Sequence, residues 1–97
     1  MKAVWIFYDI VLDATILALL KEVSPGGYTR WPRLTGDGPH GPRLDDHIWP
    51  GANAALLAVR DDASATALLA RLQELRDKVG TLTGLWACTT PVCETLR

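Results

Sequence analysis

The stretch NAALLAVR, residues 53–60, is apolar at nearly every position and is followed at once by Asp61-Asp62. A short continuous apolar run with polar ends is typical of a strand that is buried on both faces of a sheet. Residues 2–8, KAVWIFY, have the same character and are rich in residues that favour strands. These two runs predict two central strands of one sheet.

A helical pattern follows each of these strands. From residue 12 to residue 23 the apolar side chains recur at helical spacing, and Ser24-Pro25-Gly26-Gly27 ends the pattern. A second helix is predicted over 65–79, with capping residues before it and Gly80 as its C-terminal stop.

Two more polar strands complete the pattern, at 28–34, YTRWPRL, and at 83–90, TGLWACTT. Pro32 confines the first to a sheet edge or a bulge, because proline donates no ladder hydrogen bond. The order strand-helix-strand-strand-helix-strand, with right-handed crossovers, gives an α+β, ferredoxin-like βαββαβ sandwich with an antiparallel sheet and both helices on one face. The sequence therefore predicts a single domain over 1–97 with the two apolar strands at its centre.

This arrangement leaves one face of the sheet without helices. Residues 3–8 and 54–59 are apolar on both faces, so the uncovered side would be a large apolar patch on a monomer. We expect other subunits to bury it, and the pattern alone leaves dimer and trimer open.

Composition restricts the function. The chain has 97 residues, 48% of them hydrophobic, and a formal net charge of -1 with acidic and basic residues interspersed. Nucleic-acid binding is not expected, because it requires a concentration of positive charge. Asp9 and Asp13 interrupt the apolar N-terminal stretch before it could form a signal peptide or a membrane span, which predicts a cytoplasmic protein.

The segment 35–50 is rich in glycine and proline and is expected to be a connector. Gly36-Asp37-Gly38-Pro39-His40-Gly41 matches the GxGxxG dinucleotide pattern, but no helix is expected to open at GPHGPR. Pro39 and Pro42 also remove two of the backbone donors that a pyrophosphate would need, which argues against a Rossmann site. The glycines Gly36 and Gly38 can instead form an anion-binding loop with nearby arginines; an ordinary flexible connection is the alternative. The arginines in question are Arg30, Arg33 and Arg43.

Other side chains suggest metal, redox or partner contacts. His40 and His47, near Asp45 and Asp46, offer donors for zinc or copper, with a solvated loop as the alternative. Cys88 and Cys93 could close a redox-sensitive disulfide loop, or one could be a core residue and the other idle. Trp31 and Trp49 flank the connector and could pack on each other as a clasp, or could hold a ligand or a partner.

No catalytic constellation is recognisable. The sequence contains no GxSxG, HExxH, CxxC or P-loop lysine, and no pattern pairs a nucleophile with a base. A non-enzymatic protein is therefore expected.

With these features together, the chain resembles the PII-like superfamily, the trimeric signalling proteins related to nitrogen-regulatory PII and to CutA. Gly27-Tyr28-Thr29 leading to Gly36-Asp37-Gly38 is similar to the second strand and the T-loop base of that family. The strand AALLAVRDD before the second helix and Pro91-Val92 at the end of the last strand are similar too. The resemblance spans nearly the whole chain.

The resemblance implies a homotrimer with the sheets facing inward and ligand clefts between subunits, where PII proteins bind ATP or ADP. Residues 35–50 would be a shortened T-loop that reports a small-molecule effector to a regulated partner, for which a membrane transporter is a candidate. The family's phosphate-binding turn corresponds to residues 80–85, which implies a ligand contact at Gly84. Residues 91–97 would form a C-terminal tail.

The same superfamily contains a second functional class, the CutA-like and efflux-associated proteins of heavy-metal tolerance. For this alternative the candidate metal ligands are His40, His47, Cys88 and Cys93.

Overall fold

The computed structural model describes residues 1–46 and 51–96. Its main elements are β1 (Lys2–Asp9), α1 (Asp13–Val23), β2 (Thr29–Leu34), β5 (Asn53–Arg60), α2 (Asp62–Val79) and β6 (Trp86–Pro91). Shorter elements are the 3-10 turns η1 (Ile10–Leu12) and η2 (Thr81–Thr83) and the strands β3 (Gly36–Gly38) and β4 (Gly41–Arg43).

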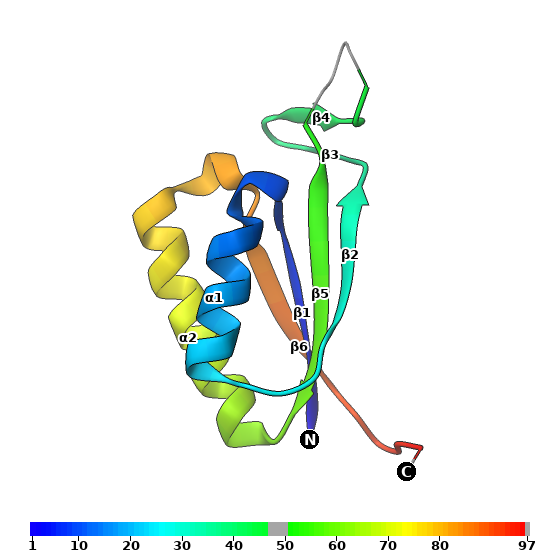
Figure 1. Cartoon of the computed structure of the whole chain (residues 1–97), viewed down its shortest axis with the longest axis vertical. Helices are drawn as coiled ribbons and strands as arrows, with labels where there is room; N and C mark the ends of the chain where they lie inside the picture. The colour runs from blue at the N-terminus through cyan, green and yellow to red at the C-terminus, as the bar shows by residue number, and fades with distance from the viewer. Residues whose placement is uncertain (47–50, 97) are drawn as a thin grey trace.

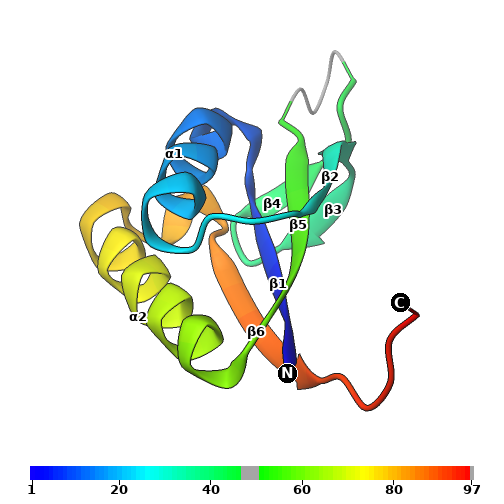
Figure 2. The ribbon, with the colours of Figure 1, turned by 60° about the horizontal axis from the view of Figure 1, so that its bottom comes forward.

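The large sheet has four strands in the order β2-β5-β1-β6, and every neighbouring pair is antiparallel. Figure 1 and Figure 2 show α1 and α2 side by side on one face of this sheet. The predicted ferredoxin-like α+β sandwich is confirmed, and so is the central position of the two apolar strands.

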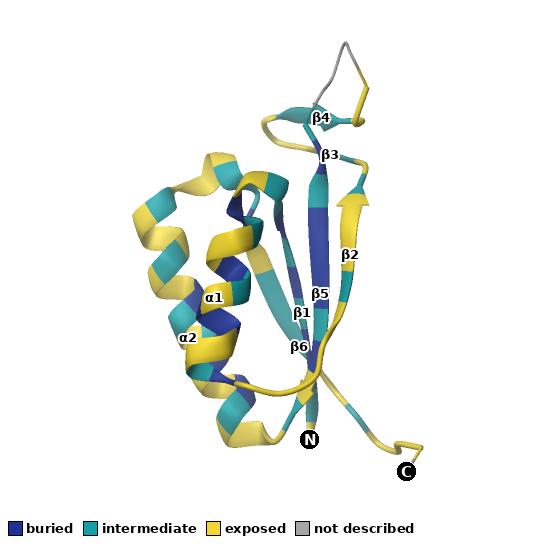
Figure 3. Cartoon of the chain, in the orientation of Figure 1, coloured by how far each residue is buried: buried dark blue, intermediate teal, exposed yellow. Residues whose placement is uncertain are grey.

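The core lies between the sheet and the helices. Along β1 every second side chain enters it, and the facing residues of β5 and both helices fill the remaining space (Figure 3). Its largest members are fully buried: Val4, Ile6, Tyr8, Ile16, Leu20, Leu56 and Leu68. Full burial of one such aliphatic side chain contributes about 1.5 to 3 kcal/mol to stability, so this layer fixes the positions of the strand ends at which the site is built.

Strand β2 is the edge strand that Pro32 predicts. It stands at the end of the strand order and pairs with β5, and its register shifts between Trp31 and Leu34, on either side of the proline. A bulge at this place accommodates the missing donor.

The helix ends follow local capping chemistry. The Asp61 carboxylate accepts the Ser64 backbone N–H at 2.7 Å, so α2 begins at Asp62, earlier than the predicted residue 65. The helix ends at Gly80, whose φ of 84° is available mainly to glycine. The last strand begins at Trp86 rather than at residue 83, because η2 occupies the preceding residues and closes at Gly84 with φ 61°.

No helix within residues 1–46 and 51–96 covers the second face of the sheet (Figure 2). Side-chain alternation places Trp5 and Phe7 of β1 on this face, and Phe7 stacks on Trp86 with ring centroids 4.9 Å apart. Trp31, Val59 and Trp86 are 39%, 42% and 51% exposed in the single chain. We call this surface the open sheet face; its residues are Trp5, Phe7, Trp31, Val59 and Trp86.

Strands β3 and β4 form a separate two-stranded hairpin within the 35–50 segment. Figure 1 shows it beyond the upper end of the large sheet, far from the C-terminal tail. No helix in the described ranges is long and apolar enough to cross a membrane.

Candidate functional site

A cavity of about 330 Å³ lies where the β3–β4 hairpin approaches the α2–β6 connection. Its volume is at the lower end of the range of small-molecule sites, about 300 to 1,000 Å³. Four of the predicted ligand residues line it, namely Gly36, Gly38, Arg43 and Gly84, together with His40. The other lining residues are Asp37, Pro39, Asn53, Arg76, Thr81, Leu85 and Trp86.

Arg43 connects the hairpin to the body of the domain. Its Nε donates to the Asp9 carboxylate at 3.2 Å, and its Nη2 donates to the Leu82 carbonyl oxygen at 2.7 Å. The two charged side chains are only 18% and 19% exposed. Arg43 therefore joins β4, the end of β1 and η2, and its charge is already balanced by a carboxylate.

Two glycines leave room for this arginine. A Cβ at Gly51 would lie 3.1 Å from Arg43 Cγ, and one at Gly84 would lie 3.2 Å from Nη1. Gly84 additionally needs its positive φ. The resemblance assigned Gly84 to a phosphate contact, and in the structure its nearest side chain is Arg43.

Asn53 lines the cavity and has a buried acceptor without a partner among the described residues. It is the first residue of β5, opposite Asp9 of β1, and a Cβ at Gly36 would lie 3.0 Å from its Nδ2. Its Oδ1 is buried and has no hydrogen-bond partner within the described part of the chain. A buried acceptor without a donor costs free energy, about 1 to 3 kcal/mol, and this atom is closed to solvent in the single chain.

Arg76 brings an unpaired cation. It lies in the last turn of α2 and lines both the main cavity and an adjoining one of about 150 Å³, which it shares with Leu85 and Trp86. Among residues 1–46 and 51–96 its guanidinium has no hydrogen bond and no ion pair. This distinguishes it from Arg43 in the same cavity.

Arg30 does not line the cavity. It faces α1 and makes two hydrogen bonds to Asp13, Nε to Oδ1 at 2.9 Å and Nη2 to Oδ2 at 2.5 Å. The buried Tyr8 hydroxyl also donates to Asp13 at 2.7 Å. The Arg30 hydrogen bonds lower the pKa of Asp13, and burial, with Asp13 as acceptor, raises the pKa of Tyr8 above its usual range. This network ties the edge strand to α1.

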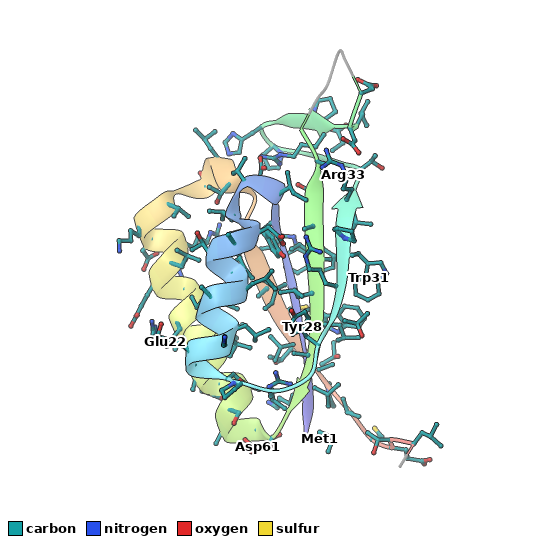
Figure 4. All side chains as sticks on the ribbon, viewed as in Figure 1. Met1, Glu22, Tyr28, Trp31, Arg33 and Asp61 are labelled. Carbon is teal, nitrogen blue, oxygen red and sulfur yellow. The ribbon has the colours of Figure 1, made fainter. Side chains whose placement is uncertain are left out.

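Arg33 also lies outside the cavity. It forms two hydrogen bonds with Asp45, at 2.9 Å and 2.6 Å, which lower the pKa of that carboxyl group. Figure 4 shows Arg33 near the end of β2, below the hairpin. Each predicted anion-binding arginine therefore already holds a carboxylate, and only Arg43 lines the cavity.

The predicted stem tryptophans are not seen together, since Trp49 lies outside the described residues. Trp31 projects from β2 away from the helices, on the open sheet face (Figure 4). The clasp between the two rings stays a prediction.

The predicted metal ligands are spread over the molecule. His40 lines the cavity, whereas Cys88 lies on β6 opposite Trp5 and Cys93 is exposed in the tail; both cysteines are free thiols. His47 lies outside the described residues. Within the described ranges no three His, Cys, Asp or Glu side chains gather into a metal-binding group. The metal alternative stays a prediction.

Sequence reasoning missed Arg76 and Asn53. On the helix pattern Arg76 looks like a solvated charge near a C-terminus, and Asn53 looks like the polar end of a buried strand. A signal for Asn53 was its amide at the start of an otherwise apolar run, but its lack of a partner is visible only in three dimensions.

Comparison with solved structures finds PII-like proteins. The nitrogen regulatory PII-like protein CPII of Thiomonas intermedia K12, solved with ADP, AMP and bicarbonate, matches with a TM-score of 0.75 and 19% identity, over 92% of this chain and 82% of that one. A putative PII-like signalling protein of Thermus thermophilus matches with a TM-score of 0.68 and 22% identity, over 92% of this chain and 83% of that one.

Sequence comparisons give no further assignment: neither protein-family models nor curated protein sequences match the chain. The relationship therefore rests on structure, over nearly the whole chain and most of each neighbour. The resemblance predicted from the glycine pairs and the strand order is confirmed as a structural one. The chain has the fold of the PII-like proteins.

Proposed function

We propose that this protein is a PII-like, non-enzymatic regulatory protein that senses a small anionic ligand, such as an adenine nucleotide or bicarbonate. The observation that carries the proposal is the cavity between the β3–β4 hairpin and the α2–β6 connection, whose lining includes Arg43 and Arg76. The bound ADP, AMP and bicarbonate of CPII, a protein of the same fold, support these ligand classes.

The proposal includes a homotrimer in which neighbouring subunits cover the open sheet face and close the ligand cleft. The exposed Trp31, Val59 and Trp86 on that face support it, because a helix-free apolar sheet surface is otherwise left in water. A second subunit would also add walls to a cavity that is small for a whole nucleotide.

The signalling element of the proposal is the 35–50 segment. Its hairpin forms one wall of the cavity and is held to the domain through Arg43, so a ligand that enters would contact it directly. We propose that the altered segment changes contact with a regulated protein in the cytoplasm, with a membrane transporter as the candidate partner.

Isothermal titration calorimetry of the purified protein tests the proposal, with ATP, ADP, AMP and bicarbonate as ligands. Saturable binding of at least one of them is expected, at one site per chain. Parallel titrations with zinc and copper test the metal-tolerance alternative, which predicts saturable binding of one of these metals. If none of the four anionic ligands shows detectable binding, the sensor proposal is overturned.

A further inference from the structure

We propose that the β3–β4 hairpin is a closure held near balance, in which the buried amide of Asn53 opposes the contact that Arg43 makes with Asp9. The inference goes beyond the proposed function, because it concerns the chain without any ligand. It identifies Asn53 as the residue that keeps the hairpin able to open.

The base of the hairpin rests on the ends of the two central strands. Gly36 and Arg43 are partners in the β3–β4 ladder, and Asp9 and Asn53 are partners in the β1–β5 ladder. Arg43 Nε donates to the Asp9 carboxylate at 3.2 Å, and a Cβ at Gly36 would lie 3.0 Å from Asn53 Nδ2. Each residue of the hairpin pair therefore meets one residue of the strand pair.

The contacts of Arg43 favour the closed hairpin. Besides the contact with Asp9, its Nη2 donates to the Leu82 carbonyl oxygen at 2.7 Å. The Arg43 and Asp9 side chains are mostly buried, and a hydrogen bond between charged groups is stronger than a neutral one. Opening the hairpin would break both contacts.

The amide of Asn53 opposes closure. Its Oδ1 is closed to solvent and accepts no hydrogen bond from the residues that the structure describes. Because Gly36 has no side chain, the backbone of β3 approaches this amide closely. Lifting β3 would let water donate to the amide oxygen, so the open hairpin is stabilised relative to the closed one.

The two opposing effects are of similar size. The stabilisation from a charged hydrogen bond overlaps in magnitude with the destabilisation from a buried acceptor that has no donor. A structural element whose open and closed states are close in free energy is shifted by weak additional contacts. Gly36, Arg43 and Asn53 all line the cavity, so a group that enters it meets both sides of this balance.

The test is hydrogen exchange of ligand-free wild type, Asn53→Leu and Asn53→Ala, measured by mass spectrometry. Leucine has nearly the shape of asparagine without its polar atoms, and alanine removes the amide altogether. Gln73→Leu is the matched control, because the Gln73 side chain is exposed on α2 and already donates to Asp77 at 2.9 Å. The amides of 36–43 report on the hairpin.

Exchange at 36–43 should slow about 5- to 100-fold in both Asn53 variants, the effect of removing a buried unsatisfied acceptor from the closed state. Gln73→Leu should leave it within about twofold of wild type. Trypsin gives a second measurement, since cleavage between Arg43 and Leu44 requires the guanidinium to leave Asp9. This cleavage should slow in the same two variants.

Unchanged or faster exchange at 36–43 in the two Asn53 variants would overturn the inference. Slower exchange confined to β1 and β5 would overturn it too, because it would show only a better strand. If leucine alone prevents folding, alanine decides; if neither variant folds, the amide supports the fold and the inference is wrong. None of these results depends on ligand binding, so the failure of this inference and the failure of the proposed function are distinguishable.

Discussion

Arg43 Nε and the Asp9 carboxylate lie 3.2 Å apart, although the residues are 34 positions apart in sequence. The contact joins the β3–β4 hairpin to the end of β1 at the edge of the cavity. It therefore connects the ligand site mechanically to the segment that we propose as the signalling element.

Asp9→Asn should loosen the hairpin without unfolding the domain. Asparagine can still cap η1, where the Asp9 carboxylate accepts the Val11 N–H at 3.0 Å, but it loses the charge that pairs with Arg43. We expect a loss of about 1 to 3 kcal/mol in the local stability of the hairpin. Hydrogen exchange of the amides at 36–43 should accelerate, while exchange in β1 and β5 stays slow. Unchanged exchange at 36–43 would contradict a role for this pair as the tether.

Gly84→Ala should be destabilising by about 1 kcal/mol or more, because φ is 61° and the added Cβ would meet Arg43 Nη1 at 3.2 Å. Gly27→Ala is the matched control, since nothing lies within 4 Å of a Cβ there. Chemical denaturation of both variants checks the difference. Equal stability of the two variants would show that Arg43 moves aside freely and that the turn tolerates a side chain.

The Tyr8–Asp13 hydrogen bond should make stability depend on alkaline pH. Burial raises the pKa of Tyr8, so the folded state keeps the hydroxyl protonated above pH about 10, where the unfolded chain ionises. Stability is therefore fully present below that pH and is lost as pH rises beyond it. Thermal melts of Tyr8→Phe between pH 8 and pH 11, about the range of tyrosine ionisation, should fall less steeply than those of wild type.

Tyr28→Phe is the control for that comparison, because Tyr28 is 49% exposed. It should keep the alkaline slope of wild type. If Tyr8→Phe and Tyr28→Phe behave alike, the buried hydroxyl is not the source of the slope.

Acid should weaken the contact between Asp13 and Arg30 in the same hydrogen-bond network. Hydrogen bonds from Arg30 lower the pKa of Asp13, so Asp13 stabilises the fold above its unfolded pKa of about 3.9 and this contribution disappears as pH falls below it. Asp13→Asn should be less stable than wild type at neutral pH and should lose less stability on acidification. The measurement is denaturant unfolding at pH about 3 and about 7. Parallel losses in both proteins would exclude Asp13 as a source of the acid sensitivity.

Val59→Glu should separate the subunits of the proposed trimer. Val59 is 42% exposed on the open sheet face, and a carboxylate there would be buried between subunits without a partner. Val11→Glu, on the 76% exposed Val11 of η1, is the control. Size-exclusion chromatography with light scattering should show a monomer for the first and a trimer for the second. A monomeric wild type, or a trimeric Val59→Glu variant, would contradict the proposed interface.

Much of the fold could be predicted because it follows local patterns. The apolar runs of β1 and β5 placed both strands at the sheet centre, and Pro32 placed β2 at the edge. The β3–β4 hairpin was not predicted, because three-residue strands built of glycine, proline and single charged residues have no alternation to recognise.

The site could be predicted only in part. The glycine pairs led to Gly36, Gly38 and Gly84, all of which line the cavity. Charge alone could not tell the arginines apart, since which of them holds a carboxylate depends on contacts such as Arg30 with Asp13. Arg76 lines the cavity without such a contact among the described residues, and a sequence does not show that.

A crystal structure of the wild-type protein, crystallised with ADP and bicarbonate, would test the ligand assignment most directly. We predict a ligand in the cavity between the β3–β4 hairpin and the α2–β6 connection. An empty cavity at saturating ligand, or a ligand bound elsewhere on the protein, would contradict this assignment.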